Sequence, residues 1–137
     1  MTSKKYTPAD LDLKVKRAST GLGLFADEAI RKGTCIIEYV GPEVPKAKRD
    51  SINSRYLFEV SKSKTIDGSP RYNTARYINH GCDPNAEPVI HGGRIFIMAI
   101  KPIAPGDEIT YDYGKDYFDM FIKPHGCRCP AHMPKAA

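Results

Sequence analysis

RYINHGCDPN, residues 76–85, is the most informative stretch of this chain. Within seven positions it gathers polar and metal-capable side chains: Asn79, His80, Cys82, Asp83 and Asn85. An exposed loop accounts for Asp83–Asn85, but not for the apolar pair Tyr77–Ile78 directly before Asn79–His80. An apolar pair that points inward carries the next polar pair into a pocket. The stretch therefore predicts a functional pocket, although a lone histidine is more often structural than catalytic.

A second stretch that mixes aromatic and acidic residues follows downstream at residues 107–114 (DEITYDYG). Tyr111 and Tyr113 are two positions apart, so in a strand they share one face. Asp107 and Glu108 are adjacent and point opposite ways in a strand, which argues against a paired-carboxylate acid/base site. The phenols are more informative, because a tyrosine hydroxyl in an apolar slot can orient a nucleophile or accept a hydrogen bond from an amine.

Two glycine motifs precede these stretches. Gly21–Gly23 (GLG) lacks the third glycine and the following helix of a dinucleotide-binding fingerprint. It is typical either of a tight turn that needs positive φ or of a backbone that approaches a ligand closely. Tyr39–Gly41 (YVG) ends an apolar run, where a tyrosine alone is more typical of core than of a site.

Short apolar runs, rich in β-branched and aromatic residues, predict a mainly β domain. The predicted strands cover Leu11–Arg17, Thr34–Val40, Tyr56–Val60, Arg94–Ile100 and Glu108–Tyr111. Only Pro45–Ile52 predicts a helix of any length, with a turn at Thr74–Ile78. Gly, Pro, Asn and Asp punctuate the chain between these segments.

Length and composition indicate one ordinary globular domain. The chain has 137 residues, of which 41% are hydrophobic and 27% charged. No apolar run approaches the roughly 20 residues that span a bilayer, and the polar N-terminus has no apolar signal core. We therefore expect a soluble protein without a signal peptide and without a membrane partner.

The charge balance is basic but diffuse. Lys and Arg number 21 against 16 Asp and Glu, which gives a net charge of +5. The basic residues are scattered, with no dense run and no aromatic ladder of the kind that grips single strands. Solvated surface charge explains this pattern better than a nucleic-acid site.

The four cysteines, Cys35, Cys82, Cys127 and Cys129, favour a reduced compartment with a metal site. A disulfide framework would need a secretory context, and none is visible. Cys127 and Cys129 are also too close in sequence to bridge each other easily. Cys35 lies in an apolar run and reads as inert core.

Taken in order, these four motifs resemble the SET-domain family of protein-lysine methyltransferases. The family pattern is G-x-G, Y-x-G, R-F-I-N-H-x-C-x-P-N and E-L-x-x-D-Y, and this chain has GLG, YVG, RYINHGCDPN and EITYDY in those places. The match runs from about Lys14 to Tyr113. It implies an N-terminal extension over residues 1–12, a SET domain over 13–119 and a post-SET-like tail over 120–137.

The resemblance implies a fold of several small β-sheets with few short helices, in which the C-terminal segment threads a loop as a pseudoknot. It implies S-adenosylmethionine (SAM) on one face and a target lysine entering a narrow channel from the other. The cofactor contacts implied by position are Leu22, Gly23, Tyr56, Arg76, Asn79 and His80. Tyr39 and Tyr111 would line the channel, with Tyr113 as the catalytic tyrosine. His80 would not act as a base.

Tyr111 bears on the product. The family often has Phe or Tyr at this position, and a tyrosine hydroxyl takes up space that a methylated amine would need. We expect a product weighted towards monomethyl-lysine.

Some relatives in the family carry a C-terminal zinc module that is completed by the cysteine of the N-H-x-C segment. Here the last cysteine of that module is absent, and His132 stands three residues after Cys129. Cys82, Cys127, Cys129 and His132 would form an acceptable Cys₃His zinc site, with His125 as a possible substitute ligand. The alternative is a tail of reduced thiols without metal.

The expected partner is a protein or peptide with a target lysine, such as a histone tail, met by a monomer or homodimer. Nucleic acid would be contacted only through chromatin. A basic substrate would need an acidic groove, for which Glu43, Asp112, Asp116 and Asp119 are candidates. The expected location is cytoplasmic for a bacterial protein and nuclear for a eukaryotic, viral or effector protein.

Two other functions compete with this one. A SET-like module that binds basic peptides without catalysis would be expected to lack Tyr113 or Asn79–His80, and both are present. A small zinc protein that binds nucleic acid would explain neither RYINHGCDPN nor the Tyr111/Tyr113 pair.

Overall fold

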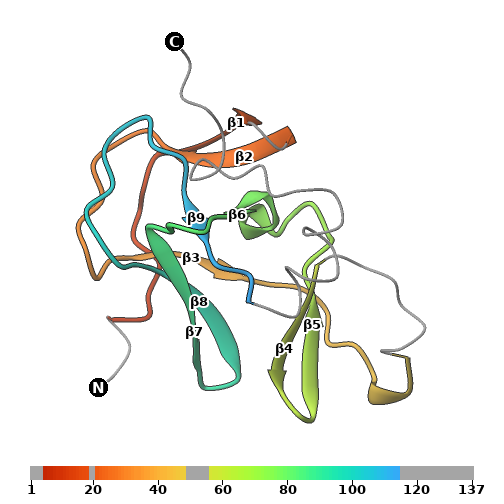
Figure 1. Cartoon of the computed structure of the whole chain (residues 1–137). Coiled ribbons are helices and arrows are strands. Elements are labelled where there is room, and N and C mark those ends of the chain that lie inside the picture. The colour runs from red at the N-terminus through yellow and green to blue at the C-terminus, as the bar shows by residue number, and fades with distance from the viewer. Residues whose placement is uncertain (1–4, 19–20, 49–55, 115–137) are drawn as a thin grey trace.

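The computed structural model describes residues 5–18, 21–48 and 56–114, and within them the regular secondary structure is almost entirely β-strand (Figure 1). The strands are β1 Leu13–Ala18, β2 Gly21–Ala26, β3 Cys35–Tyr39, β4 Leu57–Ser61, β5 Lys64–Asp67, β6 Asn79–His80, β7 Ala86–His91, β8 Arg94–Ala99 and β9 Thr110–Tyr111. Two 3₁₀ turns, η1 Lys46–Lys48 and η2 Thr74–Tyr77, are the helical elements of the described residues. The mainly β prediction is confirmed.

The strands form four small sheets. β1 pairs with β2, β4 pairs with β5, and β8 lies between β3 and β7, all antiparallel. The fourth sheet is the parallel pair β6 and β9, in which Asn79 lies opposite Thr110 and His80 opposite Tyr111. This pair joins the two motif segments, as the expected pseudoknot requires.

Four segments differ from the sequence prediction. GLG lies inside strand β2 rather than in a turn, and Gly21, its first residue, has a φ of +118°. β5 and β7 were not predicted, and β7 contains Pro88. A proline is tolerated there because β7 is an edge strand of its sheet. Of the predicted helix Pro45–Ile52, η1 is present, and residues 49–52 lie outside the described part.

The main core lies on one face of β8 and extends to the motif segments. Its largest fully buried side chains include Leu24, Ile78, Ile95, Ile97 and Ile109. The other face of β8 buries Phe96 and Met98 in a second cluster, against which Tyr6 packs. Burial on both faces explains why residues 94–100 read as a near-continuous apolar run.

The described helical turns are too short to cross a membrane.

Candidate functional site

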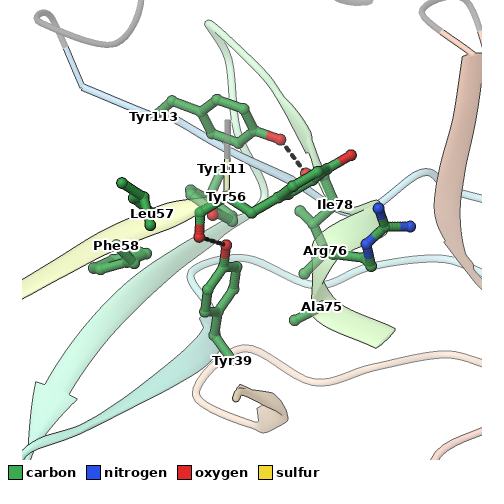
Figure 2. Close-up of a pocket in the computed structure, with 9 residues that line it drawn as sticks. All are labelled: Tyr39, Tyr56, Leu57, Phe58, Ala75, Arg76, Ile78, Tyr111 and Tyr113. Atoms are coloured by element: carbon green, nitrogen blue, oxygen red, sulfur yellow. Dashed lines mark hydrogen bonds between the residues drawn. The ribbon is translucent and has the colours of Figure 1, made fainter. Parts of the chain in front are cut away.

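An aromatic pocket of about 70 Å³ lies where β3, β4, η2 and the segment after β9 meet (Figure 2). It is lined by Tyr39, Tyr56, Leu57, Phe58, Ala75, Arg76, Ile78, Tyr111 and Tyr113. The set contains the three tyrosines expected in a substrate channel. It also contains Tyr56 and Arg76, which were expected to contact a cofactor.

The hydroxyls of two pocket tyrosines donate to backbone carbonyls (Figure 2). Tyr39 donates to the carbonyl of Tyr56 at 2.7 Å, and Tyr113 donates to the carbonyl of Ile78. A phenol has one proton to donate, so what remains on each oxygen is its ability to accept. The pocket therefore presents acceptors to a group that brings its own hydrogens.

The tyrosine rings are held by close packing. The Tyr111 and Tyr113 ring centroids are 4.9 Å apart, and those of Tyr39 and Phe58 are 5.4 Å apart. A side chain on Gly68 would collide with the Tyr39 ring, which accounts for glycine at that position. The pocket is thus a stiff aromatic slot.

Asn73 is a residue of this site that the sequence analysis missed. Its side chain is fully buried, accepts from the Val40 amide at 3.1 Å and donates to the Gly68 carbonyl at 3.0 Å. It therefore fixes the chain on both sides of the Tyr39 ring. In sequence it resembles any loop asparagine before a helical turn, so no local signal marks it.

A polar cluster, defined here as Leu22, Gly23, Asn79 and Glu108, lies where β2 meets β6. The Asn79 Nδ2 donates to the Leu22 carbonyl at 3.0 Å and to the Glu108 Oε2 at 2.8 Å. A Cβ on Gly23 would lie 2.6 Å from that carboxylate oxygen and 3.1 Å from the Asn79 Nδ2. Gly23 is thus explained by close approach and not by a positive φ.

Burial of the Glu108 carboxylate raises its pKa, and the hydrogen bond from Asn79 opposes that rise. The sequence argued against a paired-carboxylate role of Glu108 with Asp107. Its actual partner is Asn79, which lies 29 positions earlier in the chain.

His80 holds the backbone of Tyr113 through a hydrogen bond. Its Nδ1 accepts from the Tyr113 backbone amide at 3.1 Å, so this nitrogen carries no proton. In the neutral ring the proton then lies on Nε2, which is 3.1 Å from the Cys82 sulfur. Both ring nitrogens are engaged within the protein, which argues against a general base. The predicted contact of His80 with a cofactor would fall to its backbone.

Asn85 completes the hold of residues 76–85 on the downstream segment. Its Nδ2 donates to the Glu108 carbonyl at 2.8 Å, and its Oδ1 accepts from the Thr110 amide at 3.0 Å. Asn79, His80 and Asn85 therefore each bind a different part of residues 108–113. Residues 76–85 therefore position the downstream segment that carries Tyr111 and Tyr113, and they also contain several of the predicted cofactor contacts.

Arg76 has an unmet hydrogen-bonding requirement. Its Nε is buried, and no described residue accepts from it. The guanidinium stacks on the Tyr56 ring at 4.6 Å and on the Tyr77 ring at 5.0 Å. A buried donor without an acceptor costs about 1–3 kcal/mol, so a ligand acceptor at the edge of the pocket would be favoured.

The predicted zinc ligands are only partly described. Cys82 is exposed, while Cys127, Cys129 and His132 lie outside the described residues. Residues 5–18, 21–48 and 56–114 hold no group of three or more metal-binding side chains. The zinc site stays a prediction.

Comparison with known proteins identifies the family. The SET domain matches residues 21–114 of this chain. The chain therefore belongs to the SET-domain family, as its motifs had indicated.

Several curated relatives share this region. Histone-lysine N-methyltransferase mes-4 of Caenorhabditis elegans is 37% identical and covers 73% of this chain, and ASHH3 of Arabidopsis thaliana is 35% identical and covers 85%. The H3 lysine-4 specific enzyme of Saccharomyces cerevisiae is 41% identical and covers 66%. This chain spans only 14%, 35% and 10% of the lengths of these three relatives.

Solved structures agree on the fold. A crystal structure of KRYPTONITE with mCHH DNA, an H3(1–15) peptide and SAH superposes with a TM-score of 0.67 at 28% identity. The matched region covers 82% of this chain and 25% of the KRYPTONITE chain. A second KRYPTONITE structure, with mCHG DNA and SAH, gives a TM-score of 0.68 at 30% identity and covers 80% and 25%. The predicted SET fold is confirmed.

Proposed function

We propose that this chain is a SAM-dependent protein-lysine N-methyltransferase. The observation that carries the proposal is the aromatic pocket, in which the hydroxyls of Tyr39 and Tyr113 donate to the backbone and keep acceptor capacity. An amine is a ligand that brings its own hydrogens. The names of the relatives and the SAH in the KRYPTONITE structures support the same reaction.

The size of the pocket favours a lysine side chain as its occupant. Pockets for whole small molecules measure about 300–1,000 Å³, whereas this one measures about 70 Å³. It suits the end of one side chain and not an entire cofactor. The cofactor would therefore lie beside it, towards the polar cluster.

The residues on that side fit SAM. Arg76 has a buried Nε that could donate to a carboxylate, and Leu22 is an apolar side chain left 54% exposed at the edge of β2. Tyr56, Gly23, Asn79 and the His80 backbone would complete the contacts. SAM supplies an electrophilic methyl group on a sulfonium.

The pocket residues would prepare the lysine for attack. A free lysine has a pKa near 10.4, so removing its proton at pH 7 costs roughly 4–5 kcal/mol. Exclusion of water by the Tyr39, Tyr111 and Phe58 rings disfavours the charged form. The Tyr113 oxygen would accept a hydrogen bond from the neutral amine. This would point the lone pair of the amine nitrogen at the methyl group of SAM. A strong general base is not needed.

Monomethyl-lysine is the product that we propose. Tyr111 is 6% exposed, lines the pocket and packs against Tyr113, and its hydroxyl would take up part of the small space around the amine. A methylated amine would have to displace that hydroxyl or a water bound to it. Mass spectrometry of a methylated peptide tests this, and abundant trimethyl-lysine would contradict it.

The activity test is transfer of a labelled methyl group from SAM to peptide arrays that include histone tails. Wild-type protein should label a subset of lysine peptides, while Tyr113→Phe should still bind SAM but transfer little. Wild-type protein that binds SAM and labels no lysine in histones or a proteome extract would refute the proposal. The array also identifies the substrate, for which the H3 peptide bound to KRYPTONITE is one guide.

We also propose that the tail binds zinc through Cys127, Cys129 and His132 with Cys82, over the site rather than within the chemistry. Cys82 is exposed, and its sulfur lies 3.1 Å from the Nε2 of His80, whose other ring nitrogen binds the Tyr113 amide. This position near Tyr113 supports the proposal. Metal analysis of purified protein should give one zinc per chain, and Cys82→Ser should lower it. Wild-type protein without stoichiometric zinc would rule out the site.

A further inference from the structure

We propose that Glu108 is a positioning residue for cofactor binding, which acts by holding the Asn79 amide between β2 and β6. The inference rests on the proposed function, because it names a further residue of the same SAM site. Glu108 would act through Asn79 and would not itself contact the reacting atoms.

The hydrogen bonds of Asn79 determine its orientation. Its Nδ2 has two protons, of which one goes to the Leu22 carbonyl and the other to the Glu108 carboxylate. Both partners only accept, so the nitrogen must face them and the Oδ1 must face away. No described residue donates to that oxygen. Asn79 thus presents a fixed acceptor beside Leu22, where a donor group of the cofactor would bind.

The surrounding backbone is shaped around the carboxylate. Glu108 forms an isolated bridge with Phe25 of β2, and Asn85 holds its carbonyl from the other side. Glycine at position 23 leaves space for the carboxylate, because a Cβ there would lie 2.6 Å from the Glu108 Oε2. A residue with a side chain would therefore not fit on β2 at the point where the carboxylate meets Asn79.

Burial disfavours the charged form of the Glu108 carboxyl group. The residue is half-buried, and desolvation raises the pKa of its carboxyl group. Asp83, Lys101 and Asp107 line the same hollow, but no described cation forms a salt bridge with Glu108. A residue kept only for packing would not need this carboxylate. Its hydrogen bond to Asn79 is the favourable contact that opposes the desolvation.

Calorimetric binding of SAH to the full chain tests the inference without turnover. Glu108→Ala should weaken binding about tenfold, which corresponds to loss of one hydrogen bond to a charged group. Glu108→Gln keeps an acceptor and should stay within about threefold of wild type. Asp83→Ala is the matched control, because Asp83 lines the same hollow but does not contact Asn79, and it should bind SAH as wild type does.

Two further readouts separate positioning from a general loss of structure. Glu108→Ala should raise the KM for SAM, with kcat at saturating SAM and the KM for peptide each within about twofold of wild type. In an Asn79→Ala background, Glu108→Ala should cause no further loss of SAH affinity, since the residue through which it acts is gone.

The inference fails if Glu108→Ala binds SAH as wild type does, or if its loss is undiminished in the Asn79→Ala background. It also fails if Glu108→Gln is no better than Glu108→Ala. None of these results would touch the proposed function, which fails only if wild-type protein binds neither SAH nor SAM or transfers no methyl group.

Discussion

The aromatic pocket and the polar cluster draw on neighbouring residues but are built differently. Ala75, Arg76 and Ile78 line the pocket, and Asn79 belongs to the cluster. Four tyrosines line the pocket, and the hydroxyls of two of them, Tyr39 and Tyr113, donate to backbone carbonyls and can also accept. The cluster is a single amide whose protons go to a carbonyl and a carboxylate, which again leaves an oxygen as the acceptor. In both regions, donation to a fixed partner orients an oxygen that can accept a hydrogen bond.

The difference lies in their surroundings. Tyr39 and Tyr111 are buried among rings, so the pocket can desolvate an amine. Leu22 is mostly exposed and Glu108 is half-buried, so the cluster is open to a larger ligand. This contrast suggests that the pocket controls the chemistry and the number of methyl groups, while the cluster controls the affinity for the cofactor. Substitutions in each region should then change different constants.

Tyr113→Phe should have the largest effect. It removes the oxygen that would align the amine, and poor alignment of reacting groups costs about 100-fold or more in rate. We expect kcat to fall by about that factor, while the calorimetric affinity for SAH stays unchanged. Tyr6→Phe, whose ring packs on the distant outer face of β8, serves as the control. A parallel loss of SAH affinity in Tyr113→Phe would break the division between pocket and cluster.

Gly23→Ala should show the opposite pattern. The new Cβ would press on Glu108 and Asn79, and overpacking of this kind costs about 1–3 kcal/mol. SAH affinity should fall by about tenfold or more, with a smaller effect on kcat at saturating SAM.

Gly21→Ala is the matched control for Gly23→Ala on the same strand. Gly21 has a φ of +118° and open space around its Cα, so alanine there causes backbone strain without a collision. It should lower the free energy of unfolding and leave SAH affinity intact. Equal losses of affinity in the two variants would show that strand β2 as a whole, and not the cluster, sets the affinity.

Part of this arrangement follows from sequence rules alone. A two-residue spacing on a strand predicts that Tyr111 and Tyr113 share a face, and the structure places both in the same pocket. Their meeting with Tyr39 did not follow from spacing. It was implied by the family resemblance. The β6–β9 pairing brings Tyr111 beside His80, and Tyr39 reaches the same pocket from β3, a separate sheet.

Other parts had no local signal. Asn73 is fully buried because Val40 and Gly68, from separate segments, bring their backbone groups to it. In sequence, Glu108 resembles any carboxylate in a strand. Its contacts with Asn79 and Gly23 exist only in the folded chain. β7 was not predicted. It contains Pro88, which fits a strand at the edge of a sheet, and the sequence does not reveal that edge position. For Asn73 and Glu108, a determining partner is remote in sequence, namely Val40 and Asn79.

Tyr111→Phe should have a smaller effect on rate than either earlier change, since it keeps the ring and removes one hydroxyl. The freed space should shift the product from monomethyl-lysine towards dimethyl- and trimethyl-lysine, with kcat for the first methyl within about threefold of wild type. Mass spectrometry over a time course measures this shift. An unchanged product distribution would mean that the pocket does not limit methylation through Tyr111.

Glu108→Gln should have the smallest effect, visible as a pH dependence of stability. The folded-state pKa of Glu108 is raised above its ordinary value of 4.5, so the folded protein binds the proton more tightly than the unfolded chain does. This contribution to stability is full below pH 4.5 and is lost as pH rises through the folded pKa. Glutamine does not titrate, so the Glu108→Gln variant lacks this loss. Its free energy of unfolding should therefore rise relative to that of wild type between about pH 4.5 and 7. Urea unfolding at both pH values measures the difference. A pH-independent difference would show that Glu108 is not desolvated in the cluster, and the contrast with the dry pocket would then rest on the tyrosines alone.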